Sequence, residues 1–313
     1  MPIAVEQRRA SAVPAPTHAL AVLLAAVLWG TTGTVAHFAP AGSSPLAIGL
    51  ATFGVGGVVL AAISARRVLA VLCRREHTGW LIAGAVGVVL YPAAYYPSMA
   101  LAGVAVGNVV ALGSGPIFAA LLEWAVDRRR PDRRWAAATA LAVAGMALLA
   151  LGGHGGTAPA ADAWRAPVGI GLALAAGFGY ALYAFAGARL IGRGAPATGA
   201  MGALFLVGGG ACLVLLGIVG LGPLAQPTGL LTIAYLGLVP MALAYLLFGY
   251  ALRALSSSSA TTLALAEPVV ATLLAVLVVG ERPSAVGWAG LVIAAIGIAV
   301  LAVPSRAASR LRA

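Results

Sequence analysis

The sequence contains no lysine and is poor in charge of either sign. Its 313 residues include nineteen basic residues, all of them arginine, and eight acidic ones, so charged residues make up 9% of the chain. A soluble domain carries about 25% charged residues. Hydrophobic residues reach 62%, and the mean hydropathy is +1.02. This composition excludes an ordinary soluble protein and indicates an all-α chain embedded in a membrane.

Cysteine and histidine are also scarce. Cys73 is expected in a loop and Cys212 inside a span, so a disulfide between them is not expected. The four histidines all fall at span ends or in loops, no aspartate lies inside a span, and Gly113-Ser114-Gly115 therefore lacks the base that a serine nucleophile needs. We expect no enzyme, no cofactor and no bound metal, with a polytopic membrane enzyme as the lesser alternative.

The apolar stretches have lengths that suit membrane-spanning helices, each of which needs about 20 apolar residues. Ten such helices are expected, covering residues 18–37, 45–64, 79–99, 104–126, 134–152, 167–188, 199–219, 229–250, 258–279 and 284–303. The eighth is the weakest of these, because Pro240 interrupts it. Residues 1–17 are expected to form a tail, and the apolar run after Arg8-Arg9 is long enough to be an uncleaved first helix rather than a signal peptide.

The arginines predict the orientation of the chain in the membrane. With both termini in the cytoplasm, seventeen of the nineteen arginines fall on the cytoplasmic side, and Arg165 and Arg282 lie outside. The positive-inside rule favours this arrangement. Nucleic-acid binding, the competing interpretation of a net charge of +11, is disfavoured because the arginines flank apolar spans. The absence of lysine and the excess of Ala, Gly and Arg suggest a GC-rich bacterial genome, hence a bacterial plasma membrane.

The chain repeats itself across its midpoint. An offset of 152 residues places Pro116 on Pro268, Arg130-Pro131 on Arg282-Pro283 and Gly145 on Gly297. An offset of 149 places Trp29-Gly30 on Phe178-Gly179. The expected units are a first five-helix repeat (18–152), an extracytoplasmic linker (153–166), a second repeat (167–303) and a cytoplasmic tail (304–313). Because five is odd, the second copy enters from the opposite side, and the fold is predicted to be an inverted repeat.

Glu267 is the one ionisable residue expected near the middle of the membrane. It lies eleven residues beyond Ser256, about 16 Å along a helix. A carboxyl there is costly and should face the bundle interior. Pro268 follows it and is expected to bend the ninth helix, as Pro116 bends the fourth. The functional interpretation is a carboxyl that recognises a cation or proton, and the structural alternative is a protonated acid that only locks packing.

Other polar and aromatic residues inside the spans are candidates for lining a substrate cavity. Of the six tryptophans only Trp29 lies deep in a span rather than near an end, and Gly30-Thr31-Thr32-Gly33 follows it. Most such side chains pack against neighbouring helices, which is the structural alternative for each. The candidate substrate-binding residues are Glu267, Trp29, Thr32, Tyr91, Tyr95, Asn108, Tyr180, Tyr183 and Tyr245.

The chain resembles the EamA repeat, and as a whole a ten-helix member of the drug/metabolite transporter superfamily. The resemblance lies in Leu28-Trp29-Gly30, in the proline of the fourth and ninth helices, and in Glu267-Pro268 followed by Gly280-Glu281-Arg282, with late glycines at Gly287, Gly290 and Gly297. It implies alternating access around a cavity walled by helices one, three, four, six, eight and nine, and export of amino acids, other metabolites or drugs. The first repeat departs from the pattern, with Arg129 where the second has Glu281.

The charge of the expected cavity narrows the substrate. No arginine lies in mid-span, so nothing there would hold a phosphate, whereas one acid beside aromatic rings suits an amine. We expect a secondary-active exporter of amino acids or other amine-containing solutes or drugs, with protons as a candidate coupling ion. The expected partners are this substrate and the lipid bilayer, without nucleic acid, and a monomer is compatible with the sequence. A membrane sensor or assembly factor that does not transport is the alternative.

Overall fold

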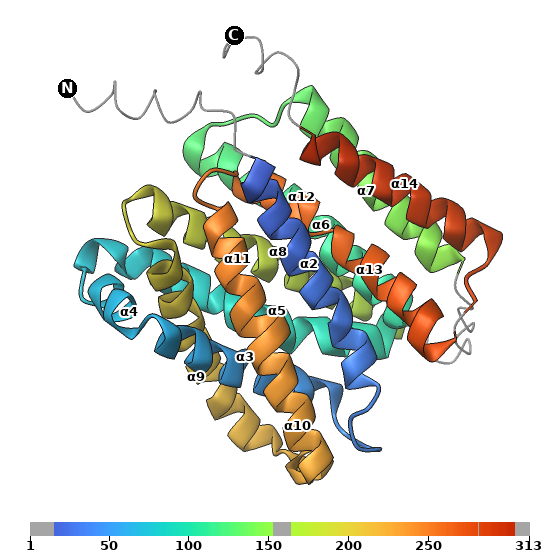
Figure 1. Cartoon of the computed structure of the whole chain (residues 1–313), viewed down its shortest axis with the longest axis horizontal. Helices are drawn as coiled ribbons and strands as arrows, with labels where there is room; N and C mark the ends of the chain where they lie inside the picture. The colour runs from blue at the N-terminus through green and yellow to red at the C-terminus, as the bar shows by residue number, and fades with distance from the viewer. Residues whose placement is uncertain (1–15, 153–163, 281, 304–313) are drawn as a thin grey trace.

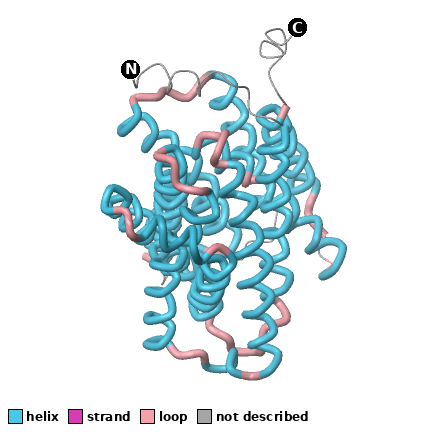
Figure 2. Tube along the Cα trace, turned by 60° about the vertical axis from the view of Figure 1, so that its left-hand side comes forward, coloured by secondary structure: helices cyan, strands magenta, loops and turns pink. Residues whose placement is uncertain are grey.

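A computed structural model describes residues 16–152, 164–280 and 282–303. Most of the expected tail 1–17, most of the expected linker 153–166, the tail 304–313 and Glu281 lie outside these described residues. Within them every regular element is a helix, as Figure 2 shows. Within these residues ten helical spans, some of them made of several consecutive elements, are long and apolar enough to cross a membrane, which confirms the number expected from the sequence.

Several spans contain more than one helical element. In chain order the elements are α2 (Pro16–Ala36), α3 (Pro45–Ile63), α4 (Ala65–Leu72), η1 (Arg75–His77), α5 (Thr78–Ala102), α6 (Val104–Asp127), α7 (Arg133–Leu151), α8 (Arg165–Gly192), α9 (Ala197–Val219), η3 (Gly222–Ala225), α10 (Pro227–Leu236), η4 (Gly237–Leu243), α11 (Ala244–Ala251), α12 (Ser257–Leu263), α13 (Ala266–Leu274), η5 (Ala275–Val279) and α14 (Ala285–Ala302).

Two features of these elements go beyond the sequence-based expectation. The connection after the second span contains a short amphipathic helix, α4, which buries Val68 and Val71 and leaves its arginines exposed. The eighth span continues through Pro240 because η4 is a π-helix, whose wider turn accommodates the missing amide of proline.

The two halves of the chain have matching elements. Adding 149 to the bounds of α5, residues 78–102, gives 227–251, which is the span formed by α10, η4 and α11. Adding 152 to the bounds of α6, residues 104–127, gives 256–279, which matches α12 to η5. The same relation pairs α2 with α8, α3 with α9, and α7 with α14. The fold is therefore two inverted five-helix repeats.

Helices α7 and α14 are repeat mates and pack side by side along one edge of the bundle (Figure 1). A methyl group added to Gly145 would lie 2.5 Å from the Gly290 carbonyl oxygen and would overlap the backbone of Ala294. One added to Gly297 would lie 2.6 Å from the Ala138 oxygen and the Ala142 nitrogen. At the offset of 152, Ala138 and Ala142 are the repeat mates of Gly290 and Ala294. The two helices therefore contact each other through equivalent residues.

The turns before these two helices are also equivalent. Asp132 caps α7 by accepting from the Trp135 amide at 2.6 Å, and its repeat mate Ser284 caps α14 by accepting from the Gly287 amide at 3.3 Å. The preceding span ends at a left-handed residue in both copies, Arg128 with φ of 57° and Gly280 with φ of 81°. Glycine adopts this conformation without strain, and arginine does so at a cost.

One end of the bundle collects the arginines, and we call it the arginine-rich end. It carries Arg66, Arg67, Arg74, Arg75, Arg128, Arg129, Arg130, Arg133, Arg134, Arg189, Arg193 and Arg253. Contacts join these segments to one another: Arg189 pairs with Asp127, Arg67 donates to Thr198, and Arg193 donates to the Glu76 carbonyl. The arginine positions that gave the topology in the sequence therefore meet at one face of the fold.

The glycine contact between α7 and α14 can be tested with the smallest possible substitution. Gly145→Ala should lower stability by about 1–3 kcal/mol, because its methyl group has only backbone to displace. Thermal unfolding of the purified protein in detergent measures the change. Gly171→Ala is the matched control, since Gly171 of α8 has nothing within 4 Å of the added carbon. Equal unfolding temperatures for the two variants would contradict the packing argument.

Candidate functional site

Nine aromatic side chains from both repeats meet in the interior of the bundle, and we call them the central aromatic cluster. Its members are Trp29, Phe53, Tyr91, Tyr95, Tyr180, Tyr183, Phe205, Tyr245 and Phe248. They come from α2, α3, α5, α8, α9 and α11, so the cluster spans the interface between the repeats. Ring pairs at such spacing stabilise each other beyond the area they bury.

The centre of the cluster is a pair of hydroxyls. Tyr183 of α8 and Tyr245 of α11 are 1% and 3% exposed, and their hydroxyl oxygens lie 2.6 Å apart. Among the described residues each hydroxyl has the other as its hydrogen-bond partner. A buried hydroxyl without a partner is costly, so this bond fixes how α8 and α11 face each other.

Trp29 lies on the side of the cluster formed by the eighth span. Its ring is 5.2 Å from that of Tyr245 and 5.6 Å from that of Phe248. It is 8% exposed. The glycine after it lets α13 approach closely, because a methyl group on Gly30 would lie 2.7 Å from Val270. Trp29 thus packs between helices in this structure.

Tyr91 and Tyr95 extend the cluster along α5. Their rings stack 5.1 Å apart with 14° between the planes. The Tyr95 hydroxyl donates to the Asn108 Oδ1 of α6 at 2.6 Å. All three side chains are half-buried. The neighbouring Tyr96 fills the space beside Gly49 of α3.

Glu267 lies just beyond a break in the ninth span. The break separates α12 from α13, and the Ala264 carbonyl accepts from the Glu267 amide at 2.9 Å because Pro268 has no amide to offer. Glu267 is half-buried, whereas Pro268 is buried. Its helix, α13, packs against α2, where Gly30, the residue after Trp29, lies against Val270, three residues beyond Glu267. Within the described residues Glu267 forms no ion pair.

The repeat mate of Glu267 is Gly115, and a tyrosine takes the space that its missing side chain leaves. A methyl group on Gly115 would lie 2.8 Å from the Tyr180 ring. The fourth span runs without a break through Pro116, as the single helix α6. One repeat therefore contributes a carboxyl and a broken helix at this level, and the other contributes a continuous helix and an aromatic ring.

The predicted site residues fall into two sets by accessibility. Trp29, Tyr180, Tyr183 and Tyr245 are each less than 9% exposed. Glu267, Tyr91, Tyr95, Asn108 and Thr32 are half-buried. Thr32 is the least connected of these, since its neighbour Thr31 makes the contact to the second repeat by accepting from the Tyr235 hydroxyl at 3.2 Å.

Sequence reasoning missed three members of the cluster: Phe53, Phe205 and Phe248. The rings of Phe205 and Tyr245 lie 4.3 Å apart, and Phe53 joins Phe205 to Tyr91. A phenylalanine in an apolar span has no polar atom that marks it as different from a lipid-facing residue. Only the position of each helix relative to its neighbours reveals which phenylalanines point inward.

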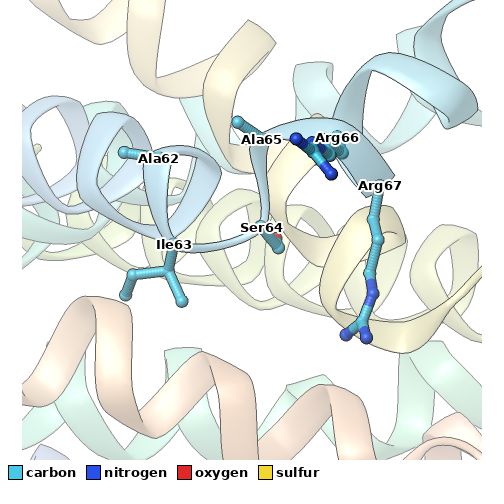
Figure 3. A pocket seen from close by; sticks show the side chains of 6 residues that line it. All are labelled: Ala62, Ile63, Ser64, Ala65, Arg66 and Arg67. Carbon is cyan, nitrogen blue, oxygen red and sulfur yellow. The ribbon is translucent and has the colours of Figure 1, made fainter.

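Two surface pockets of the described structure lie away from this cluster, at the arginine-rich end. One, of about 450 Å³, surrounds the turn between α3 and α4 and is lined by residues 62–67, with the Arg67 side chain extending away from the Ala62 turn (Figure 3). Ser64 in this turn donates to the Thr198 carbonyl at 3.1 Å. The other pocket lies between α6 and α7. Neither contains a predicted site residue, so the central aromatic cluster with Glu267 remains the candidate site.

Ten apolar helices in two inverted repeats, with a carboxyl and aromatic side chains between them, define a polytopic membrane transporter. The EamA-like transporter family matches residues 17–151 and 167–303, one copy in each repeat, and the chain belongs to this family. The resemblance seen in the sequence to ten-helix transporters of the drug/metabolite superfamily is thereby confirmed.

Two known proteins are similar over nearly the whole chain. The uncharacterized transporter YwfM of Bacillus subtilis (strain 168) is 34% identical over 296 residues, covering 92% of this chain and 95% of that protein. A crystal structure of another protein superposes with a TM-score of 0.76 over 95% of this chain and 99% of that one, at 23% identity. The second similarity supports the fold alone.

The hydroxyl pair at the centre of the cluster can be tested with a double-mutant cycle. Tyr183→Phe and Tyr245→Phe should each lower stability by about 1–2 kcal/mol, because each leaves a buried hydroxyl unpartnered. The double variant should lose less than the sum of the two, since it removes both hydroxyls. Thermal unfolding in detergent gives the three values. Strictly additive losses would mean that the two hydroxyls do not bond in the folded protein.

Proposed function

We propose that this transporter is a secondary-active exporter of small amine-containing solutes, such as amino acids or amine drugs. In this proposal it resides in a bacterial plasma membrane with the arginine-rich end and both termini in the cytoplasm. The orientation rests on the positive-inside rule, which relates arginine in short loops to the cytoplasmic side. Substrate binds beside Glu267 and moves between the two faces by alternating access of the inverted repeats.

The polar contacts between repeats support a state that is closed at the arginine-rich end. Glu123 of α6 accepts from the Ser257 hydroxyl at 2.6 Å, the Ser258 amide at 2.9 Å and the Ser258 hydroxyl at 2.8 Å. Arg189 of α8 pairs with Asp127 of α6, and Arg134 of α7 donates to the Val300 carbonyl of α14. His18 of α2 stacks on Tyr250 of α11 at 4.7 Å.

The accessibility of the site residues agrees with this state. The buried set, Trp29, Tyr180, Tyr183 and Tyr245, joins α2, α8 and α11. Tyr95 and Asn108 are half-buried, and the Tyr91 ring connects Tyr95 to the buried rings of Tyr180 and Tyr183. We propose that, in this orientation, the arrangement corresponds to the outward-facing state, with the buried rings between Glu267 and the cytoplasm. Breaking the Glu123 contacts would then be part of opening inward.

The charge of the site favours an amine. Glu267 has no positive partner within the described residues, so a cationic group on the substrate would supply one. The rings of the central aromatic cluster can hold an ammonium group by cation–π contact. This half-buried, unpaired carboxyl between the repeats is the observation that carries the proposal.

Replacing Glu267 by Gln should abolish the preference for amines. We expect export of primary amines and amino acids to fall at least about tenfold, the loss of roughly 1.4 kcal/mol or more of substrate binding. N-acetylated forms, which lack the positive charge, should respond much less. Wild-type flux should also fall as the pH at the substrate-binding face is lowered, because a protonated carboxyl no longer pairs with an ammonium. Glu267→Gln should lose this dependence. Cells or proteoliposomes that contain each variant provide the measurement.

Glu76→Gln is the matched control for that experiment. It is the same substitution at an acid whose side chain is 63% exposed at the arginine-rich end. Flux of amines that is unchanged by Glu267→Gln at every pH would remove Glu267 from the mechanism. An equal loss in the Glu76 control would point to an effect of overall charge.

The Glu123 contacts predict a change in local opening. Glu123→Gln should weaken the bonds to α12 by about 1–3 kcal/mol, because bonds to a charged acceptor are the stronger kind. Amide hydrogen exchange of residues 257–263 should therefore become faster by about tenfold or more. Exchange in α9 should stay unchanged and serves as the internal reference. Unaltered protection of α12 would show that Glu123 does not hold this end closed.

A further inference from the structure

A groove opens on the outer surface of the bundle between α6 and α7, at the arginine-rich end. Its volume is about 480 Å³. Three elements line it: helix α6, the turn that follows, and the first turn of α7. The lining residues are Ile117, Ala120, Leu121, Trp124, Arg130, Pro131 and Trp135.

The wall formed by α6 is apolar and faces outward. Ile117, Leu121 and Trp124 are 47%, 48% and 46% exposed, so these large side chains meet the surroundings of the bundle rather than another helix. In a membrane-spanning helix such residues contact lipid acyl chains. Trp124 lies three residues before the end of α6, at the depth where an indole prefers the boundary with the headgroups.

The mouth of the groove is polar, and among the described residues its polar groups have no anionic partner. The Trp135 indole Nε1 is buried and has no acceptor within the described part of the chain. Arg130 lines the groove, and Arg128 and Arg129 are exposed beside it. No carboxylate of the described residues pairs with these three arginines.

The acidic residues in the same region are already bound elsewhere. Asp127 pairs with Arg189, Asp132 caps α7, and Glu123 accepts three bonds from the start of α12. The mouth of the groove therefore holds a net positive charge.

The second repeat provides an internal comparison. At an offset of 152 it keeps the arginine and proline of the turn, as Arg282 and Pro283. It has Val276 in place of Trp124 and Gly287 in place of Trp135. The Gly287 backbone packs directly against Gly152, where a methyl group would overlap it. The indole walls therefore belong to the first repeat alone and are not required by the shared fold.

The turn itself carries a further difference between the repeats. The left-handed residue that ends the span is Gly280 in the second repeat and Arg128 in the first. A left-handed arginine is strained relative to glycine. The first repeat thus has three consecutive arginines here, Arg128 to Arg130, although the left-handed backbone at Arg128 favours glycine.

We propose that this groove binds one anionic phospholipid of the adjacent membrane leaflet. An acyl chain lies against Ile117, Leu121 and Trp124. The headgroup phosphate pairs with Arg130, next to the exposed Arg128 and Arg129. Basic pockets between membrane helices suit such headgroups because charge and hydrogen bonding act together at the edge of the hydrocarbon. A free phosphate would use the mouth but not the apolar wall, so the complete groove fits a lipid.

Native mass spectrometry of the purified full-length protein in detergent tests the proposal. Phosphatidylglycerol and phosphatidylcholine with identical acyl chains are added separately at matched concentrations. We expect one phosphatidylglycerol to remain bound, with at least about tenfold preference over phosphatidylcholine. Phosphatidylglycerol, but not inorganic phosphate, should also raise the unfolding temperature. Equal retention of the two lipids, or stabilisation by inorganic phosphate alone, would overturn the proposal.

Two variants separate the groove from the general charge of this end. Arg130→Gln should weaken phosphatidylglycerol binding at least about fivefold, whereas Arg282→Gln, the matched change in the second repeat, should leave it unchanged. Leu121→Trp should displace the lipid with every arginine still present, because it fills the groove from a position that is already half-exposed and so does not disturb packing. Undiminished binding to Arg130→Gln or Leu121→Trp, or an equal loss in Arg282→Gln, would refute the site. The readout is independent of transport, so it also stands apart from the proposed substrate.

Discussion

Close approach of helix backbones at glycine is the constraint on which this structure depends. In a bilayer the hydrophobic effect does not drive helices together, and contact relies on packing at short range. The protein has 41 glycines, and those of α7 and α14 face each other reciprocally with no room for a methyl group. The same device brings α2 to α13 at Gly30, and α5 to α8 at Gly87 and Gly179. Such contacts fix the positions of the spans, and the spans fix which side chains meet inside.

The two repeats share one helical arrangement, and the candidate site is formed by residues at which they differ. Glu267 has Gly115 as its mate, and the Tyr180 ring occupies the space that Gly115 leaves. The ninth span breaks before Pro268, whereas the fourth continues through Pro116. A symmetric pair of acids would repel each other in a medium of low dielectric constant. The structure instead has a single carboxyl at this level, between the two repeats.

The arginine-rich end combines two roles that would be hard to separate by composition alone. Some of its charges are used in contacts between elements, as in Arg189 with Asp127 and Arg134 with the end of α14. Others, from Arg128 to Arg130, face outward beside an apolar groove and pair with no described carboxylate. The first kind holds helices in place, and the second leaves charge available to the membrane surface.

The sequence by itself determined the ten spans, the two inverted repeats and the isolation of Glu267, because span length, repeat register and the cost of a mid-membrane charge depend on local composition. It could not show that Tyr183 bonds Tyr245, or that Phe53, Phe205 and Phe248 complete the cluster, since a phenylalanine that faces lipid and one that faces the interior look alike in an apolar helix. It also gave no sign that Glu123 holds α12. Such pairings depend on the rotation of each helix about its axis, which only the packing of all ten spans decides.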